Sequence, residues 1–261
     1  MNMTPKTALI TGASSGIGLE LAHEFASHGY NLVLVAREQE KLHKVAKTLS
    51  REYGQQVEAI TLDLTEVQSF DQLTQQLKAQ KIQIDVLINN AGFGLFGSAI
   101  ETDYSIERNM IELNIVALTR LTKYFATKMS ERGSGSIINV ASTASFFPGV
   151  YMSVYYATKA YVLSYSLALA EELASSGVHV MALCPGPTKS GFSSRAHATR
   201  TKLFGNPMKA RVVAKLAYRG MKSKRRIVVT GAKNKASVFL SRLVPRGLAA
   251  RLVRGASQQS K

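Results

Sequence analysis

The sequence predicts a doubly wound α/β fold of about seven parallel strands with helices on both faces. Short runs rich in β-branched residues and leucine alternate with longer segments of helical period along the chain, which is the pattern of a parallel sheet packed between helices. Of the 261 residues, 46% are hydrophobic and 19% are charged. Such a chain can bury a large core and is too apolar to remain disordered.

The expected elements alternate strictly from one end of the chain to the other. Continuously apolar runs predict strands over residues 6–11, 31–36, 57–61, 84–88, 136–141, 178–183 and 226–230. Segments of helical period predict helices over residues 16–28, 38–53, 68–80, 103–132, 154–176, 207–221 and 233–254. With right-handed crossovers this order builds one sheet. We find no repeat, low-complexity segment or long linker, and therefore expect a single domain over residues 1–261.

The least regular stretch is about residues 187–206. It is rich in Ser, Thr and Gly and shows no clear period. Long loops of this kind in compact enzymes often close over a substrate, so we expect a lid here, with Phe192, Leu203 and Phe204 as its apolar residues.

Positive charge is concentrated in the last third of the chain. The chain has 33 Lys and Arg against 17 Asp and Glu, a net charge of +16. Residues 1–172 hold 14 basic and 17 acidic side chains, whereas residues 173–261 hold 19 basic and none acidic. Residues 233–254 combine this charge with apolar residues at helical spacing, and Pro245 is expected to kink the segment or start a second helix.

The basic amphipathic segment has several interpretations. It packs against the core or a neighbouring subunit with its arginines in solvent, or it lies on an anionic membrane surface. Alternatively, its charge attracts an acidic acyl carrier or the phosphates of a CoA thioester. Nucleic acid ranks last because no recognised binding motif is present.

Several classes of protein are excluded. Cys184 is the single cysteine, so an internal disulfide framework is excluded, and we expect it to be a small buried residue. The five histidines are scattered, and no metal site is expected. No run approaches the ~18 apolar residues of a membrane span, and the first apolar run is too short for a signal peptide. We expect a cytoplasmic protein, with peripheral contact at a membrane surface as an open possibility.

A glycine-rich turn follows the first strand. It reads Thr11-Gly12-Ala13-Ser14-Ser15-Gly16-Ile17-Gly18 and opens the first helix. Glycines allow a sharp turn and close approach to a pyrophosphate, and the helix N-terminus offers free N–H groups. Between the first strand and the first helix of an α/β fold, this spacing favours a dinucleotide site over simple turn chemistry.

The second strand ends at Arg37, where NAD-selective domains place an acidic residue that binds the ribose hydroxyls. An arginine can instead pair with a 2′-phosphate through its planar set of donors. The alternative is a solvated Arg37 that starts the next helix and is partly neutralised by Glu38. We expect NADP(H) in preference to NAD(H).

Tyr155 and Lys159 are four residues apart in a predicted helix, so their side chains share one face. A lysine ammonium beside a phenol lowers the tyrosine pKa and makes the tyrosine a usable proton donor. Many surface helices carry such a pair. Here, however, further polar or glycine-containing positions follow successive strands: Asp63-Leu64, Asn89-Asn90-Ala91-Gly92, Ser142 and Pro185-Gly186, with Asn114 in the helix after the fourth strand.

With these motifs, the chain resembles the short-chain dehydrogenase/reductase family over essentially its whole length, including a branch with 3-ketoacyl-thioester and hydroxysteroid reductases. The resemblance implies a Rossmann-type domain and no metal. It also implies that Tyr155 protonates the carbonyl oxygen, Ser142 orients that oxygen, Lys159 binds the nicotinamide ribose and lowers the pKa of Tyr155, and Asn114 holds a water linked to Lys159.

The resemblance also implies the cofactor contacts. Gly12, Ser14, Ser15, Gly16, Ile17 and Gly18 would surround the pyrophosphate and adenosine side, with Arg37 at the 2′-phosphate. Asp63 and Leu64 would meet the adenine, and Asn90, Ala91 and Gly92 its ribose. Pro185, Gly186, Thr188 and Ser190 would meet the nicotinamide, the carboxamide contact remaining open between Thr188 and Ser190. Ser15 departs from NADP-selective members, which often carry a basic residue there.

The expected substrate is a lipophilic ketone or a 3-oxoacyl thioester. The residues expected to make an apolar pocket are Phe93, Leu95, Phe96, Phe146, Phe147, Pro148, Val150, Tyr151 and Met152. The alternative for each of them is packing in the core, and for Phe146 and Met152 the two interpretations have equal weight. The alternative function is a non-catalytic NADP-binding regulatory or membrane-associated protein on the same fold. Because residues 154–176 are apolar on more than one side, we also expect a homodimer or homotetramer.

Overall fold

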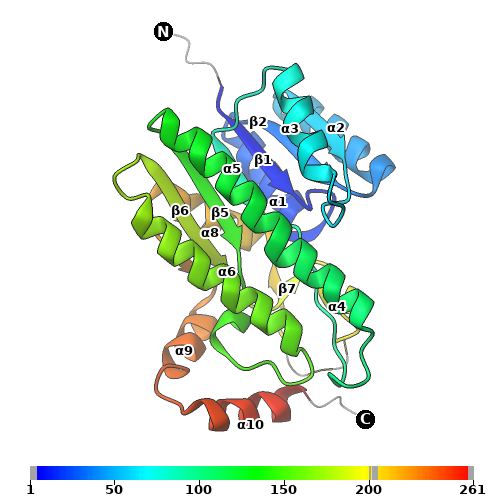
Figure 1. Ribbon diagram of the computed structural model, residues 1–261, viewed down its shortest axis with the longest axis vertical. Helices are drawn as coiled ribbons and strands as arrows, with labels where there is room; N and C mark the ends of the chain where they lie inside the picture. The colour runs from blue at the N-terminus through cyan, green and yellow to red at the C-terminus, as the bar shows by residue number, and fades with distance from the viewer. Residues whose placement is uncertain (1–4, 200, 202–204, 258–261) are drawn as a thin grey trace.

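Seven parallel strands form one sheet in the computed structural model, which describes residues 5–199, 201 and 205–257 (Figure 1). The sheet order is β3-β2-β1-β4-β5-β6-β9. The strands are β1 (Thr7–Thr11), β2 (Asn31–Ala36), β3 (Val57–Thr61), β4 (Val86–Asn89), β5 (Gly135–Val140), β6 (Val178–Cys184) and β9 (Ile227–Val229). The strand order reverses between β1 and β4, and ligands bind at the carboxyl end of such a switch point.

Helices cover both faces of the sheet, as the sequence predicts. One face carries α1 (Gly16–Ser27), α2 (Gln39–Tyr53) and α8 (Ala210–Lys222), and the other carries α3 (Ser69–Ala79), α5 (Leu118–Glu131) and α6 (Ser153–Glu172). Neighbouring residues of β1 point to opposite faces: Ala8 and Ile10 pack in the first core, and Leu9 packs in the second. All three are fully buried, which explains the continuous apolar run in the sequence.

The helix expected over residues 103–132 is interrupted. It consists of α4 (Tyr104–Ile111), the π-helical turn η1 (Glu112–Ala117) and α5. Asn114 lies inside the π-helical turn and is fully buried. Such turns occur mostly inside longer helices and often at functional sites, so the interruption marks the place where this long helix meets the site.

The expected C-terminal helix over residues 233–254 is two helices. These are α9 (Ala232–Leu240) and α10 (Arg246–Ser257), which lie together at one end of the molecule (Figure 1). Pro245 precedes α10 directly. Proline fits the start of a helix and cannot continue one, so the second of the two outcomes expected for Pro245 is the one found.

The region expected as an irregular lid contains short elements. Strand β7 (Thr188–Lys189) pairs with β8 (Met208–Lys209), and α7 (Phe192–Arg195) lies between them in sequence. A further short helix, η2 (Thr143–Phe146), follows β5. Elements of two to four residues are too short to show a period. The predicted lid residues Leu203 and Phe204 lie outside the described residues.

Candidate active site

A cavity of about 580 Å³ opens at the carboxyl ends of the central strands. Nearly all predicted site residues line it. They are Gly12, Ser14, Ser15, Gly16, Ile17, Arg37, Asp63, Leu64, Asn90, Ala91, Gly92, Ser142, Tyr155, Lys159, Pro185, Gly186, Thr188 and Ser190. Gly18 and Asn114 are not in the lining, but each contacts a residue that is: Gly18 packs against Gly12, and Asn114 is hydrogen-bonded to Phe93.

The glycine turn provides a cradle that side chains would fill. Gly12 has φ of +65°, and a Cβ added there would lie 2.9 Å from the Cα of Ala91. A Cβ on Gly18 would lie 2.2 Å from the carbonyl oxygen of Gly12. Ser15, at the N-cap of α1, makes no capping hydrogen bond through its side chain. The N-terminal amides of α1 thus remain available for an anion, and the turn fits a pyrophosphate.

Asn90 holds this turn against the neighbouring strand. Its Nδ2 donates to the carbonyl oxygen of Thr11 at 2.9 Å, and its backbone N–H donates to Thr11 Oγ1 at 3.0 Å. The backbone N–H of Ala91 donates to the same hydroxyl at 2.9 Å. The backbone and side-chain amides of Asn90 therefore hold this part of the cavity lining in place. Gly92, two residues further on, has no side chain and presents only its backbone to the cavity.

At one end of the cavity, Arg37 Nη1 lies 3.4 Å from Asp63 Oδ2. The Arg37 side chain is 66% exposed and that of Asp63 is 35% exposed, so most of the guanidinium remains available to a ligand. Partial burial would raise the pKa of Asp63, but hydrogen bonds from Thr65 and the nearby Arg37 outweigh it and lower that pKa overall. Asp63 is thus an anion that orients Arg37 at the cavity edge.

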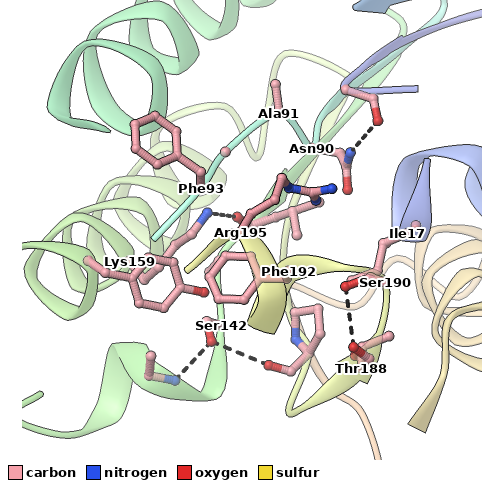
Figure 2. Close-up of a pocket in the computed structure, with 18 of the residues that line it drawn as sticks. Ile17, Asn90, Ala91, Phe93, Ser142, Lys159, Thr188, Ser190, Phe192 and Arg195 are labelled. Carbon is pink, nitrogen blue, oxygen red and sulfur yellow. Dashed lines mark hydrogen bonds between the residues drawn. The ribbon is translucent and has the colours of Figure 1, made fainter. Parts of the chain in front are cut away.

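At the other end, the first turns of α6 carry Tyr155 and Lys159, both buried. Lys159 Nζ donates to the carbonyl oxygen of Val140 at 2.8 Å and lies 5.9 Å from the centre of the Tyr155 ring. Ser142 Oγ accepts from the backbone N–H of Ala144 at 3.1 Å. Figure 2 shows Lys159 and Ser142 on one side of the space that they share with Phe192.

Burial shifts the pKa values of both side chains on α6. It raises the pKa of Tyr155, and the hydrogen bond with Ser142 opposes this only in part. Burial also lowers the pKa of Lys159 from 10.5 to about 8, although the nearby Cys184 opposes it. In this structure the Lys159 ammonium donates to Val140 and burial is the largest influence on the pKa of Tyr155, so the lowering of that pKa by Lys159 stays a prediction.

Asn114 supports the wall of the cavity. Its Nδ2 donates to the Phe93 carbonyl oxygen at 3.0 Å and to Thr158 Oγ1 at 3.1 Å, and its Oδ1 accepts from the Phe93 N–H at 3.2 Å. A Cβ on Gly92 would lie 2.8 Å from Asn114 Oδ1. These contacts give Asn114 a positioning role, while its link to Lys159 through a water stays a prediction.

The segment after β6 closes the side of the cavity near Ser142. Thr188 Oγ1 donates to the Gly186 carbonyl oxygen at 2.8 Å, and Ser190 Oγ donates to the Thr188 carbonyl oxygen at 3.3 Å. Both hydroxyls line the cavity, so the choice between them for a carboxamide remains open. Gly186 is needed for packing, because a Cβ there would lie 2.2 Å from Asn234 Nδ2 of α9.

Several lining residues were missing from the predicted site. Arg195 of α7 projects into the cavity (Figure 2), and α9 and α10 contribute Asn234, Ser237, Val253 and Ala256. No local sequence signal identifies them, since their position depends on how distant helices fold back. Of the residues expected to make the apolar pocket, Phe93, Phe147 and Met152 line it, as does the predicted lid residue Phe192. The others expected there, including Phe146, are absent from the lining.

Comparison with known proteins agrees with this geometry. The short chain dehydrogenase family matches residues 6–201. A short-chain dehydrogenase from Sphingobium yanoikuyae, solved in complex with NADPH, is 34% identical with a TM-score of 0.82, covering 94% of this chain and 95% of that one. The ketoacyl reductase HetN of Nostoc is 33% identical over 204 residues, 78% of this chain and 71% of that protein. Very-long-chain 3-oxoacyl-CoA reductase-B of Danio rerio is 33% identical over 185 residues, 69% of this chain and 58% of that protein.

The chain therefore belongs to the short-chain dehydrogenase/reductase family. It is an oxidoreductase with a site for a nicotinamide cofactor, and it acts on carbonyl or alcohol groups. This assignment decides against the alternative of a non-catalytic binding protein.

Proposed function

We propose that the protein is an NADPH-dependent reductase that converts the carbonyl group of a lipophilic ketone or a 3-oxoacyl thioester to an alcohol. The observation that carries this proposal is the continuous cavity, which joins Arg37 and the glycine turn to Tyr155, Ser142 and Lys159. The family and its ketoacyl-reductase relatives support the same reaction class.

The residues present fit NADP(H). The glycine cradle and the N-terminus of α1 accommodate a pyrophosphate, and the exposed guanidinium of Arg37 can pair with a 2′-phosphate. A cation at this position favours NADP(H) because NAD(H) has no phosphate there. When bound, the reduced nicotinamide supplies the hydride that adds to the carbonyl carbon.

Tyr155 is the proposed proton donor to the carbonyl oxygen. Its phenol holds a proton near neutral pH, as a general acid must before it donates. Ser142, bonded at the start of η2, is held in a fixed place where its hydroxyl can orient the same oxygen. Lys159 is proposed to bind the nicotinamide ribose hydroxyls and, as an ammonium, to stabilise the phenolate left after proton transfer.

The walls around Tyr155 favour an apolar substrate. The ring centres of Phe192 of α7 and Tyr155 are 5.1 Å apart. Phe93, Met152 and Tyr156 continue the apolar lining. Burying such a surface against hydrocarbon is favourable. We therefore propose a lipophilic chain or ring system beside the reacting carbonyl.

We also propose that the enzyme is a homodimer or homotetramer. Val116 of η1 and Tyr161 and Leu167 of α6 remain partly exposed on one side of the molecule, although they are large apolar residues. A second copy would cover such residues through a self-complementary contact.

The experiment that tests the function is NADPH oxidation with a panel of carbonyl compounds. The panel comprises 3-oxoacyl thioesters of increasing chain length, steroid ketones and small polar ketones. We expect kcat/KM to rise with apolar surface in at least one lipophilic series. Turnover confined to the small polar ketones would contradict the proposed substrate class.

A further inference from the structure

The helices α9 and α10 lie at one end of the molecule (Figure 1), and they and the residues that join them expose large apolar side chains. Phe239 is 63% exposed, Leu240 57%, Leu243 70%, Leu248 49% and Leu252 61%. A contiguous segment of a monomeric protein rarely exposes so many large apolar residues unless something covers them.

The orientation of α10 strengthens this observation. Its smaller side chains Ala249, Val253 and Ala256 point inward, where Val253 and Ala256 line the cavity. Its larger side chains Leu248 and Leu252, one helical turn apart, point outward. A helix that only covered a core would turn its leucines inward, so the outer side of α10 is suited to an apolar medium outside the chain.

Cations alternate with these apolar residues along the sequence. Residues 233–254 carry six exposed cations and no acid: Lys233, Lys235, Arg242, Arg246, Arg251 and Arg254. In the described part of the chain, none of the six forms a salt bridge with an acidic side chain. An amphipathic segment with basic and large apolar residues is typical of a helix that lies in the interface of an anionic bilayer.

Charge decides between the possible occupants. A second copy would bring six further cations against the first six, which costs free energy. An acidic carrier protein would account for the cations and leave the five apolar residues unexplained. An anionic lipid surface satisfies both, since its headgroups pair with the cations and its acyl region receives the leucines and Phe239.

We propose that residues 232–257 dock the protein peripherally on an anionic lipid bilayer. No helix within the described residues is long and apolar enough to cross a membrane, so the contact lies on the surface of the bilayer. Because α9 and α10 also line the cavity, docking places one wall of the cavity against the lipid. Combined with the proposed function, this gives lipophilic carbonyl compounds a route from the bilayer to Tyr155.

Vesicle sedimentation of the full chain tests docking without any measurement of activity. The probes are vesicles rich in phosphatidylglycerol and vesicles of phosphatidylcholine alone. The first variant combines Phe239→Ser, Leu243→Ser and Leu252→Ser, and its control combines Ile100→Ser and Val67→Ser, which are exposed apolar residues elsewhere. The second variant combines Arg242→Gln, Arg246→Gln and Arg251→Gln, and its control makes the same change at Lys222, Lys224 and Arg225.

We expect the wild-type protein to sediment with anionic vesicles and to be released by salt. A cation near an anionic leaflet strengthens binding by about fivefold, so the arginine variant should lose about a hundredfold, and the apolar variant at least tenfold. Both controls should bind nearly as the wild type does. Wild-type protein that stays in the supernatant, or controls that lose as much as the variants, would overturn docking. Docking would also be overturned if the apolar variant bound anionic vesicles as the wild type does and differed from it only in oligomeric state.

Discussion

At the scale of single residues, burial has the largest effect on the pKa values of Tyr155 and Lys159 on α6. Tyr155 and Lys159 share one helix face, as their spacing predicts, and burial is the largest influence on the pKa of each, raising that of Tyr155 and lowering that of Lys159. The buried lysine has a pKa lowered to about 8 from 10.5. Holding it charged thus costs folding free energy that an exposed lysine would not cost.

This pKa shift predicts a pH dependence of stability for the cofactor-free protein. Between about pH 8 and 10.5 the unfolded chain binds the Lys159 proton and the folded chain does not, so the contribution of Lys159 to the unfolding free energy rises with pH. We expect denaturant titrations to show that the unfolding free energy of the wild type rises relative to that of Lys159→Met across this window. A difference independent of pH would contradict the lowered pKa.

Arg37 is predicted to set the cofactor preference. Charge-assisted hydrogen bonds are worth about 1.5–3 kcal/mol, so Arg37→Gln should lower kcat/KM for NADPH by about tenfold to a hundredfold and leave the value for NADH nearly unchanged. Lys47→Gln removes the same charge from an exposed position of α2 outside the cavity lining. Equal losses in the two variants would point to general electrostatics and not to a 2′-phosphate contact.

At the scale of elements, the glycine turn and the seven strands of the sheet could be anticipated because their causes are local. Buried parallel strands give continuous apolar runs, and the glycines occupy positions that admit no side chain. The π-helical turn around Asn114 could not be anticipated, since its side chain is anchored by Phe93 and Thr158, far away in sequence. The same applies to Arg195, whose place in the cavity depends on how the segment after β6 folds back.

Gly18 provides a test of the turn as an element. An alanine Cβ would lie 2.2 Å from the Gly12 carbonyl oxygen and 2.5 Å from Asn90 Nδ2. We expect Gly18→Ala to destabilise the fold by about 1–3 kcal/mol through overpacking and to weaken NADPH binding measured by fluorescence titration. Gly255→Ala is the control: it has open space in α10 and should be neutral or slightly stabilising. Normal NADPH binding by Gly18→Ala would contradict the close packing of the turn.

At the scale of the whole molecule, two exposed apolar surfaces differ in their charge: the surface of α9 and α10 is strongly basic, and that of η1 and α6 is not. In the sequence, the excess positive charge belongs to residues 173–261, whereas most cofactor and catalytic motifs lie in residues 1–172, which hold 14 basic and 17 acidic side chains. By contrast, η1 and α6 together contain a single cation, the buried Lys159. This separation lets one surface meet a second copy while another meets lipid.

The proposed subunit contact is tested by light scattering in solution. Val116→Glu combined with Leu167→Glu should shift the protein to a monomer, because two acids on a self-complementary contact face their own copies. Val212→Glu, at a 42% exposed position of α8 on the other face of the sheet, is the control and should leave the assembly unchanged. A wild-type protein that is already monomeric at high concentration would contradict the contact.

The central claim is that Tyr155 donates a proton to a carbonyl oxygen beside bound NADPH, and Tyr155→Phe tests it most directly. The ring, its contact with Phe192 and the cavity stay in place, and only the hydroxyl is removed. We expect NADPH to bind with nearly unchanged affinity, while kcat with the best lipophilic substrate falls at least a hundredfold, the usual contribution of a general acid being about 10²–10⁴. Substantial reductase turnover by this variant would contradict the assignment.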